Sequence, residues 1–520
     1  MATSEQVIGT IILIVFYSAL IIYFVIRGAQ KTKSLSDYAV GNVNFSPIFV
    51  GLSLAVSMTS AATFVINPGL IAVYGISGVI SFGIVFPLAS IISLIILTKS
   101  FRKFGKNLKA LTLAQWIGKR YDSKYYALFM GFLSLLLITF IVLILVALTK
   151  VLSKALNANE IIVLAGIIVF VFGYMMFGGA NSLVYTNTIQ AVVMLIVAFI
   201  LLFSGYNFFE GGIGSFIDRL AAIDPVLIKS TNSQSPLFRD FYEIIFAQIF
   251  VGIAVVCQPH IITKSLFIKK EKDVNKFLVT VVIAELIFFS VVFVGLYARI
   301  GFPDLTFMGE KLNVDGIITA YVIKIFANGI VSVIIGLFVI LGLISAGLST
   351  LEGLIQSLST TITSDIIEPL FANKIKKEKT YININRLAII FLAVISFFMS
   401  VNQLINPKLS VAILAQNGVY AYFSTAFIPI VFGIYIKKVD IKVPVIASIV
   451  ALTIHFIIYY GLPILVKDYG FNFGFATKYL SGTIRNPAVA ASTAIIISSV
   501  TGLIIHQITK KKIIFNTLNN

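Results

Sequence analysis

The residues best suited to chemistry lie between Leu341 and Ile366, in an otherwise apolar stretch. Hydroxyl, carboxyl and amide side chains recur there at intervals of three and four residues: Ser345, Ser349, Glu352, Gln356, Thr360 and Thr363. In an α-helix this spacing places their oxygen atoms on one face. Such oxygens are the ligands that hard cations prefer. The pattern therefore predicts a helix whose polar face binds a cation and around which the rest of the protein moves.

This helix is expected to cross a membrane. It continues the apolar run from Ile330 to Ile340. A polar stripe on a spanning helix cannot face lipid, because unsatisfied polar groups in hydrocarbon are costly. The stripe must therefore face other helices or a water-filled cavity.

The composition agrees with a membrane protein made of helices. Of the 520 residues, 59% are hydrophobic and 12% are charged. Many apolar runs approach the roughly 20 residues that a spanning helix needs, whereas a β-barrel would show alternating segments of about ten. The single cysteine, Cys257, excludes disulfides within the chain, and the three histidines form no zinc-enzyme motif. We expect no enzymatic activity.

Thirteen spans are predicted. They are residues 6–27, 45–75, 76–100, 125–150, 159–178, 182–205, 240–263, 274–301, 322–366, 383–402, 408–436, 441–466 and 486–509. An odd number places the two termini on opposite sides of the membrane. No connection is long enough to form a soluble domain with its own core.

The lysines and arginines predict the orientation. Six alternate connections, the third of them from Lys264 to Lys276, hold 27 of the 39 basic residues. The positive-inside rule then places the N-terminus outside and the C-terminus in the cytoplasm. The same asymmetry accounts for the net charge of +18 without a nucleic-acid partner. We expect a multi-pass protein of the plasma or inner membrane.

The second span is expected to be broken. It carries small polar residues before Asn67-Pro68-Gly69, namely Ser57, Thr59, Ser60 and Thr63. Proline and glycine there predict a kink or an unwound turn, and small polar residues beside such a break indicate a transporter binding site. The alternative is a simple proline kink in which the hydroxyls bond their own backbone. A second break is predicted at Gln258-Pro259-His260.

Four motifs together resemble the sodium/solute symporter family, with a leucine-transporter-like fold. They are Ser57–Ala61 before Pro68; Gly178-Gly179 with Tyr185–Gln190; Gln258-Pro259-His260 followed by Lys264; and Ala346–Thr350 with Thr363–Asp365. The resemblance extends from about Ser36 to Lys438. It implies one transmembrane transporter domain: an extra N-terminal helix and loop (1–44), an inverted-repeat core of five plus five helices (45–436), and C-terminal helices and tail (437–520).

The resemblance also implies a sodium site, sodium being the coupling ion. Its ligands would be the carbonyls of Val56, Thr59 and Ala346 and the hydroxyls of Ser349 and Thr350. Sodium is a hard cation, and an unwound helix frees carbonyl oxygens for it. The alternative for Ser349 and Thr350 is close helix packing by small residues.

Two positions depart from the family pattern. Asn187 stands where many relatives carry an aspartate, and Glu352 stands where they carry a small or polar neutral residue. A carboxylate within a membrane is costly and is by default functional. We expect Glu352 and Asn187 to form a second site, for a cation or a proton. The alternative is a protonated Glu352 hydrogen-bonded inside the bundle. Glu285, also within a span, is expected to be a structural pair or anchor.

The expected partner is a small-molecule solute imported with sodium, together with the lipid bilayer, and no obligatory protein partner. Candidate solute-binding residues are Thr63, Asn67, Gln258 and Gln416. His260 is expected to orient the broken helix. The pattern is most similar to the pantothenate, proline and monocarboxylate branches, so we expect a carboxylate-bearing solute. The alternatives are proton coupling, a sugar or inorganic anion as solute, or a channel-like pathway.

Overall fold

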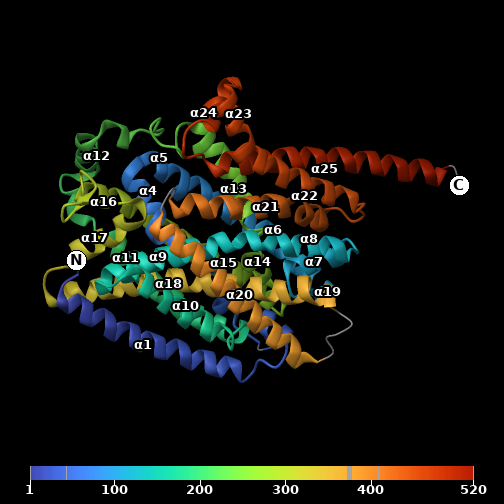
Figure 1. The fold of residues 1–520 in the computed structure, drawn as a ribbon, viewed down its shortest axis with the longest axis horizontal. Coiled ribbons are helices and arrows are strands. Elements are labelled where there is room, and N and C mark those ends of the chain that lie inside the picture. Colours follow the sequence, from blue (N-terminus) through green and yellow to red (C-terminus); the bar gives the residue numbers. More distant parts are fainter. Residues whose placement is uncertain (1, 43, 372–376, 407–409, 519–520) are drawn as a thin grey trace.

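A computed structural model describes residues 2–518 except 43, 372–376 and 407–409. The start of the basic connection predicted from Lys374 to Arg386 and the start of the predicted span 408–436 lie outside the described residues. Over the described part of the chain the fold is almost entirely helical. Its two strands, β1 (Thr306–Phe307) and β2 (Glu310–Lys311), form one antiparallel hairpin. Most long helices in Figure 1 run close to the horizontal axis, as in a membrane bundle. The predicted all-α polytopic fold class is confirmed.

Ten segments within the described residues are long and apolar enough to cross a bilayer. They are α1 (Ser4–Ala29), Ile76–Gly105, Lys124–Leu156, Ala180–Phe209, Glu271–Gly301, Ile330–Phe371, α20 (Glu378–Ile405), α21 (Val411–Tyr435), Lys442–Tyr469 and Pro487–Lys510. Two bent helix pairs raise the number to 12. The remaining predicted span corresponds to α10 (Glu160–Met175), whose 16 residues reach only about 24 Å at 1.5 Å per residue. Thirteen crossings therefore remain a prediction.

Seven of these segments contain one α-helix or two α-helices in succession. They are α5 (Ile76–Gly78) and α6 (Phe86–Leu108); α8 (Lys124–Ser134) and α9 (Ile138–Leu156); α11 (Ala180–Phe203); α15 (Val274–Ser290) and α16 (Val294–Gly301); α18 (Ile330–Thr361) and α19 (Glu368–Phe371); α22 (Lys442–Phe456) and α23 (Leu462–Tyr469); and α25 (Pro487–Leu518). Short helices connect them: α2 (Leu35–Val40), α7 (Leu113–Arg120), α12 (Gly212–Ile223), α17 (Ile317–Ile325) and α24 (Thr477–Leu480).

The first bent pair joins α3 (Pro47–Met58) to a π-helical turn, Ala62–Ile66, and α4 (Asn67–Tyr74), with a bend of 55°. The break falls at Thr59, whose backbone is extended (φ −98°, ψ 94°). The expectation of a break at Asn67-Pro68-Gly69 is therefore wrong. Pro68 instead lies in a helical path that continues from the π-helical turn Ala62–Ile66 into α4, where the wider turn accommodates its missing N–H.

The second bent pair joins residues Tyr242–Val255, which include α13 (Gln248–Val255), to Pro259–Phe267, with a bend of 56°. Gln258 is extended (φ −74°, ψ 139°) and caps α14 (Pro259–Ile262), so this break lies where it was predicted. A short 3₁₀ helix, Thr263–Phe267, then continues the chain. The expectation that Lys264 lies in a basic loop is wrong, because the helical path extends beyond it and buries its side chain.

Helix α18 lies at the centre of the bundle. It packs against α1, α3, α9, α10, α11 and α20, and Figure 1 shows it crossing the middle of the molecule. From Val339 to Thr361 every residue except Ser357 is buried. Because the polar stripe of α18 is covered by protein on all sides, the prediction that it avoids lipid is confirmed.

Helix α4 approaches two neighbouring backbones closely, each at one glycine. A Cβ on Gly295 would lie 2.1 Å from the Pro68 carbonyl oxygen, and one on Gly69 would lie 2.2 Å from the Val314 carbonyl oxygen. Only glycine fits such contacts with a neighbouring backbone. The second half of the first broken helix is thus held closely against α16 and the residues before α17.

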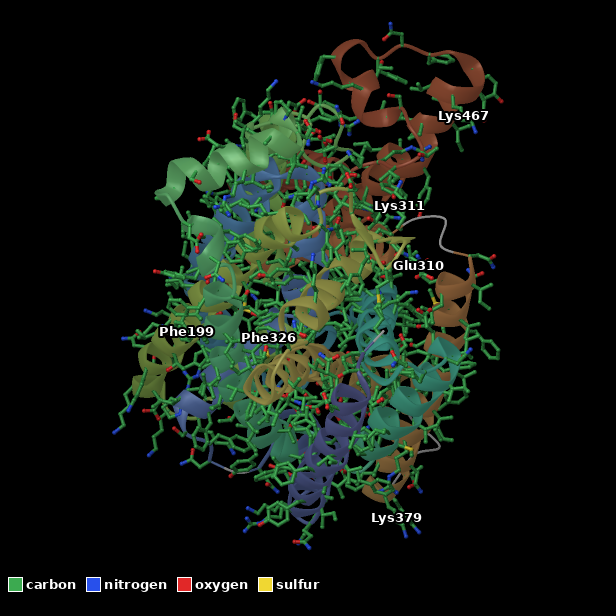
Figure 2. All side chains as sticks on the ribbon, turned by 90° about the vertical axis from the view of Figure 1, so that its left-hand side faces the viewer. Phe199, Glu310, Lys311, Phe326, Lys379 and Lys467 are labelled. Carbon is green, nitrogen blue, oxygen red and sulfur yellow. The ribbon has the colours of Figure 1, made fainter. Side chains whose placement is uncertain are left out.

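The C-terminal helices lie to one side of this core. Helices α22 and α25 pack on each other and on α21. In Figure 2, Lys467 of α23 lies on the segment that projects above the bundle, whereas Lys379 of α20 lies at its lower edge. The two termini lie at opposite ends of the long axis in Figure 1. The division at residues 44 and 436 remains a prediction.

Candidate ion and solute site

The first break meets the polar face of α18 at the Val56 carbonyl. The Ser349 hydroxyl donates to this oxygen at 2.9 Å, and the Thr350 hydroxyl donates to it at 3.2 Å. The same hydroxyls lie 3.2 and 3.4 Å from the Ala346 carbonyl oxygen. All four residues are fully buried. The structure therefore brings together four of the five predicted sodium ligands.

Thr59, the fifth predicted ligand, lies at the break itself. Its N–H closes the last turn of α3 on the Ala55 carbonyl at 2.9 Å. Its hydroxyl donates to the Glu285 carboxylate at 3.1 Å. The other carboxylate oxygen of Glu285 is buried and has no hydrogen-bond partner within the described residues. Glu285 thus contacts the break, a role that its sequence context did not indicate.

These oxygens can hold a small hard cation. Carbonyls only accept, but each hydroxyl has one proton and two lone pairs. In the arrangement seen, the hydroxyl protons point at carbonyls. When a cation binds, the hydroxyls can rotate and present lone pairs instead. Neutral oxygen ligands from two separate helices fit Na⁺, which needs no carboxylate for moderate affinity.

A second polar cluster surrounds Glu352, also fully buried. Its carboxylate accepts hydrogen bonds from the Tyr174 hydroxyl, from the Thr186 hydroxyl at 3.1 Å and from the Gln190 amide at 3.4 Å. Asn187 lies beside it. The Asn187 amide is assigned the orientation in which its oxygen faces hydrogen-bond donors and its nitrogen faces acceptors. In this orientation the Asn187 nitrogen donates to Glu352 at 3.0 Å. The two residues predicted to form a second site therefore do lie in contact.

Lys264 occupies the far side of Asn187. Its ammonium lies 3.0 Å from the Asn187 amide oxygen in that orientation. It also donates to the Ser53 carbonyl at 2.7 Å, to the Ser53 hydroxyl at 3.0 Å and to the Ser57 hydroxyl. The residue pattern had indicated no role for Lys264 in this cluster. The sequence did contain one indication that Lys264 is buried: it follows His260 by four residues, which places both side chains on the same face if the helix continues.

A cavity adjoins the first break. It encloses about 850 Å³ of space between atoms, part of it open to solvent. All four predicted solute residues line it: Thr63, Asn67, Gln258 and Gln416. None of the described residues that line it is charged. Ser57 and Ser60 of the broken segment also line it, so the cavity lies directly beside the cluster at Val56.

His260 lines the same cavity. Both of its ring nitrogens, and the Gln258 amide oxygen, are buried without a hydrogen-bond partner in the part of the chain that the structure describes. The His260 ring packs edge-on against Phe140, with ring centres 6.1 Å apart. Buried polar atoms are rarely left unpaired, so these groups are suited to a bound solute or water. His260 was expected only to orient the helix.

The sequence is similar to those of known transport proteins. A sequence profile of the sodium:solute symporter family matches residues 38–450. The chain is 25% identical over 422 residues to a sodium/pantothenate symporter of Haemophilus influenzae, covering 79% of this chain and 82% of that protein. It is 23% identical over 447 residues to sodium/proline symporter 2 of Staphylococcus saprophyticus, covering 82% and 81%.

A solved structure has a similar fold. It is the substrate-bound, outward-open state of a Na⁺-coupled sialic acid symporter, with a TM-score of 0.72 and 17% sequence identity. The likeness covers 95% of this chain and 98% of that one. The arrangement of the helices is therefore shared over nearly the whole length.

The cavity assignment predicts a difference in thiol reactivity. Cys257, the one native cysteine, is fully buried, so the wild-type protein should not react with N-ethylmaleimide. A Gln416→Cys variant should react, because this side chain is half-buried on the cavity wall. Ser345→Cys is the matched control, since Ser345 is fully buried against Tyr17. Mass spectrometry of the intact protein measures the labelling, and equal labelling of both variants would contradict the assignment.

Proposed function

The chain belongs to the sodium:solute symporter family, and we propose that it imports one small carboxylate-bearing solute with sodium by alternating access. Sodium-coupled transport of a solute follows from the family. We propose in addition that the solute carries a carboxylate, and we assign the residues that bind the ion and the orientation of the chain in the membrane.

The proposal is carried by the convergence of two α18 hydroxyls on the carbonyl at the end of α3. Ser349 and Thr350 both reach the Val56 oxygen, and the Ala346 carbonyl lies beside them. We assign the sodium site to these groups with the Thr59 carbonyl. A sodium ion there would bind α3 to α18 more tightly than the hydroxyls alone, because its full positive charge attracts the oxygens of both helices more strongly than a neutral hydroxyl does.

Ion and solute share one structural element. Val56 lies against α18, whereas Ser57, Ser60 and Thr63 of the same broken segment line the cavity. Sodium binding would order this segment and so position the residues that bind the solute, which raises the affinity for the solute. By thermodynamic linkage, solute binding would raise the affinity for sodium by the same factor. The coupling needs no long pathway, because both sites take some of their groups from the residues between Val56 and Thr63.

The carboxylate is supported by the chemistry of the cavity. Pantothenate, proline and sialic acid, which name three of the similar symporters, are all carboxylic acids, whereas another similar protein is named for glucose. The described lining offers neutral hydrogen-bond donors and no cationic side chain. A carboxylate bound there would be neutralised by the adjacent sodium ion. The alternatives are a sugar or an inorganic anion as the solute, coupling to protons, and a channel. Gradient-driven uptake in proteoliposomes distinguishes them.

We further propose that the N-terminus lies outside and the C-terminus inside. The positive-inside rule supports this orientation, and the opposite placement of the termini in Figure 1 agrees with an odd number of crossings.

Two further parts of the proposal concern the second site and the repeat. We propose that Asn187 and Glu352 form a second cation site, and that residues 45–436 form the inverted-repeat core.

Orientation predicts side-specific labelling of exposed positions. A membrane-impermeant maleimide should label Ser4→Cys on intact cells, because Ser4 is exposed and belongs to the terminus that we propose to lie outside. Lys379→Cys, also exposed, should be labelled only after the membrane is permeabilised. The buried native cysteine provides the background. Labelling of Lys379→Cys on intact cells would reverse the orientation.

Sodium coupling predicts gradient-driven uptake in proteoliposomes. Radiolabelled proline, pantothenate, pyruvate, acetate and sialic acid form the panel, with glucose and iodide as solutes without a carboxylate. One of the acids should accumulate when sodium is high outside, and a sodium ionophore should abolish this accumulation. A protonophore should leave it intact. Uptake that persists without a sodium gradient would rule out symport, and accumulation of glucose or iodide alone would rule out the carboxylate.

The assigned ligands predict a selective loss of sodium affinity. Ser349→Ala combined with Thr350→Val removes both hydroxyls while keeping the helix packed. The sodium concentration for half-maximal uptake should rise about tenfold or more, since about 1.4 kcal/mol of lost binding is a factor of ten. Ser345→Ala is the matched control, because its hydroxyl contacts Tyr17 instead of the break. An unchanged sodium dependence in the double variant would overturn the assignment.

A further inference from the structure

The environment of the Lys264 ammonium is that of a bound cation. Four oxygen atoms surround it: the Ser53 carbonyl, the Ser53 and Ser57 hydroxyls, and the Asn187 amide oxygen. The residue is only 2% exposed. A charge buried this deeply is tolerated only with close polar partners and an opposite charge within reach. The cluster supplies both kinds of group.

The opposite charge is Glu352, and its carboxylate is fully engaged. One oxygen accepts from Tyr174 and Gln190. The other accepts from Thr186 and from the Asn187 amide nitrogen. A carboxylate offers about four lone-pair positions, and four donors occupy them. A metal ion could bind Glu352 only by displacing one of these donors.

Asn187 connects the two charges. Its amide oxygen faces the ammonium, and its amide nitrogen faces the carboxylate. An amide is suited to this position because one end accepts and the other donates. An aspartate at 187 would instead present a second carboxylate to Glu352. The bridge therefore fits a permanent pair of opposite charges and does not fit a carboxylate site that waits for a free ion.

We propose that Lys264 is a tethered cation that fills the second cation site, so that a single sodium ion accompanies each solute. This inference rests on the proposed function, because it fixes the stoichiometry of that transport. It replaces the free cation of the Glu352–Asn187 site with the chain's own ammonium. A sodium ion would leave the site in each cycle, whereas Lys264 stays attached to the second broken helix. Its bonds to Ser53 and Ser57 then hold that helix to α3.

The test is equilibrium binding of ²²Na⁺ to the purified full-length protein, which needs no knowledge of the solute. The wild-type protein should bind one ion. Binding of two ions would overturn the tethered cation but leave sodium symport intact. Binding of none would contradict the sodium site of the proposed function instead. The two failures are thus distinguishable.

Variants extend the test. The Lys264→Ala substitution removes the ammonium and leaves the oxygens of Ser53, Ser57 and Asn187 around an empty space. A second sodium ion can occupy this space, so the variant should bind two ions. Lys264→Ala combined with Glu352→Gln removes both charges and should return to one. A single ion bound to a monodisperse Lys264→Ala protein would overturn the proposal. If neither variant folds, the wild-type stoichiometry alone decides.

Discussion

The carbonyl oxygen of Val56 is the group on which the rest of the site depends. Inside a bilayer, every backbone polar group needs a partner within the protein. Ser60, whose N–H would complete a regular turn on Val56, lies beyond the end of α3. Ser349 and Thr350 supply the missing donors from another helix. Because hydroxyls also carry lone pairs, the same atoms can bond the carbonyl or share it with an ion.

A second constraint is the burial of opposite charges. Glu352 and Lys264 lie in the middle of the bundle, where either charge alone would be strongly destabilising. Asn187 separates them but bonds to both. The cluster joins four parts of the fold: the polar stripe of α18, the helices α10 and α11, and the segment after the second break. Its hydrogen bonds fix the positions of these parts around α3.

The sequence was sufficient for the fold class, because the fold class follows from local patterns. The ligands of the first site came instead from the resemblance to a family, and they remain a proposal. Apolar runs predict spans, and the three-four spacing of Ser345, Ser349 and Glu352 predicts a buried polar face. The position of the first break was wrong, since the helical path continues from the π-helical turn through Pro68, and the chain opens at Thr59 instead. Where a helix opens instead depends on which distant side chains can bond its carbonyls. One sequence does not reveal those partners.

Lys264 was misplaced for a related reason. A lysine after an apolar run normally marks the membrane surface. Here the helical path resumes after Pro259, so the side chain enters the bundle. Its partners Ser53 and Asn187 come from positions far away in the chain. Contacts of this kind depend on tertiary packing, as do the unpaired nitrogens of His260.

A single mobile cation determines what can drive transport. If the solute carries one carboxylate and one sodium accompanies it, the translocated unit is neutral, because the Glu352 and Lys264 charges remain with the protein. The membrane potential then contributes nothing. A tenfold sodium gradient supplies about 1.4 kcal/mol and supports about tenfold accumulation. A zwitterion such as proline would instead carry one net charge inward and use the potential as well. The charge of the solute and the tethered ammonium therefore together determine how far the solute can be concentrated.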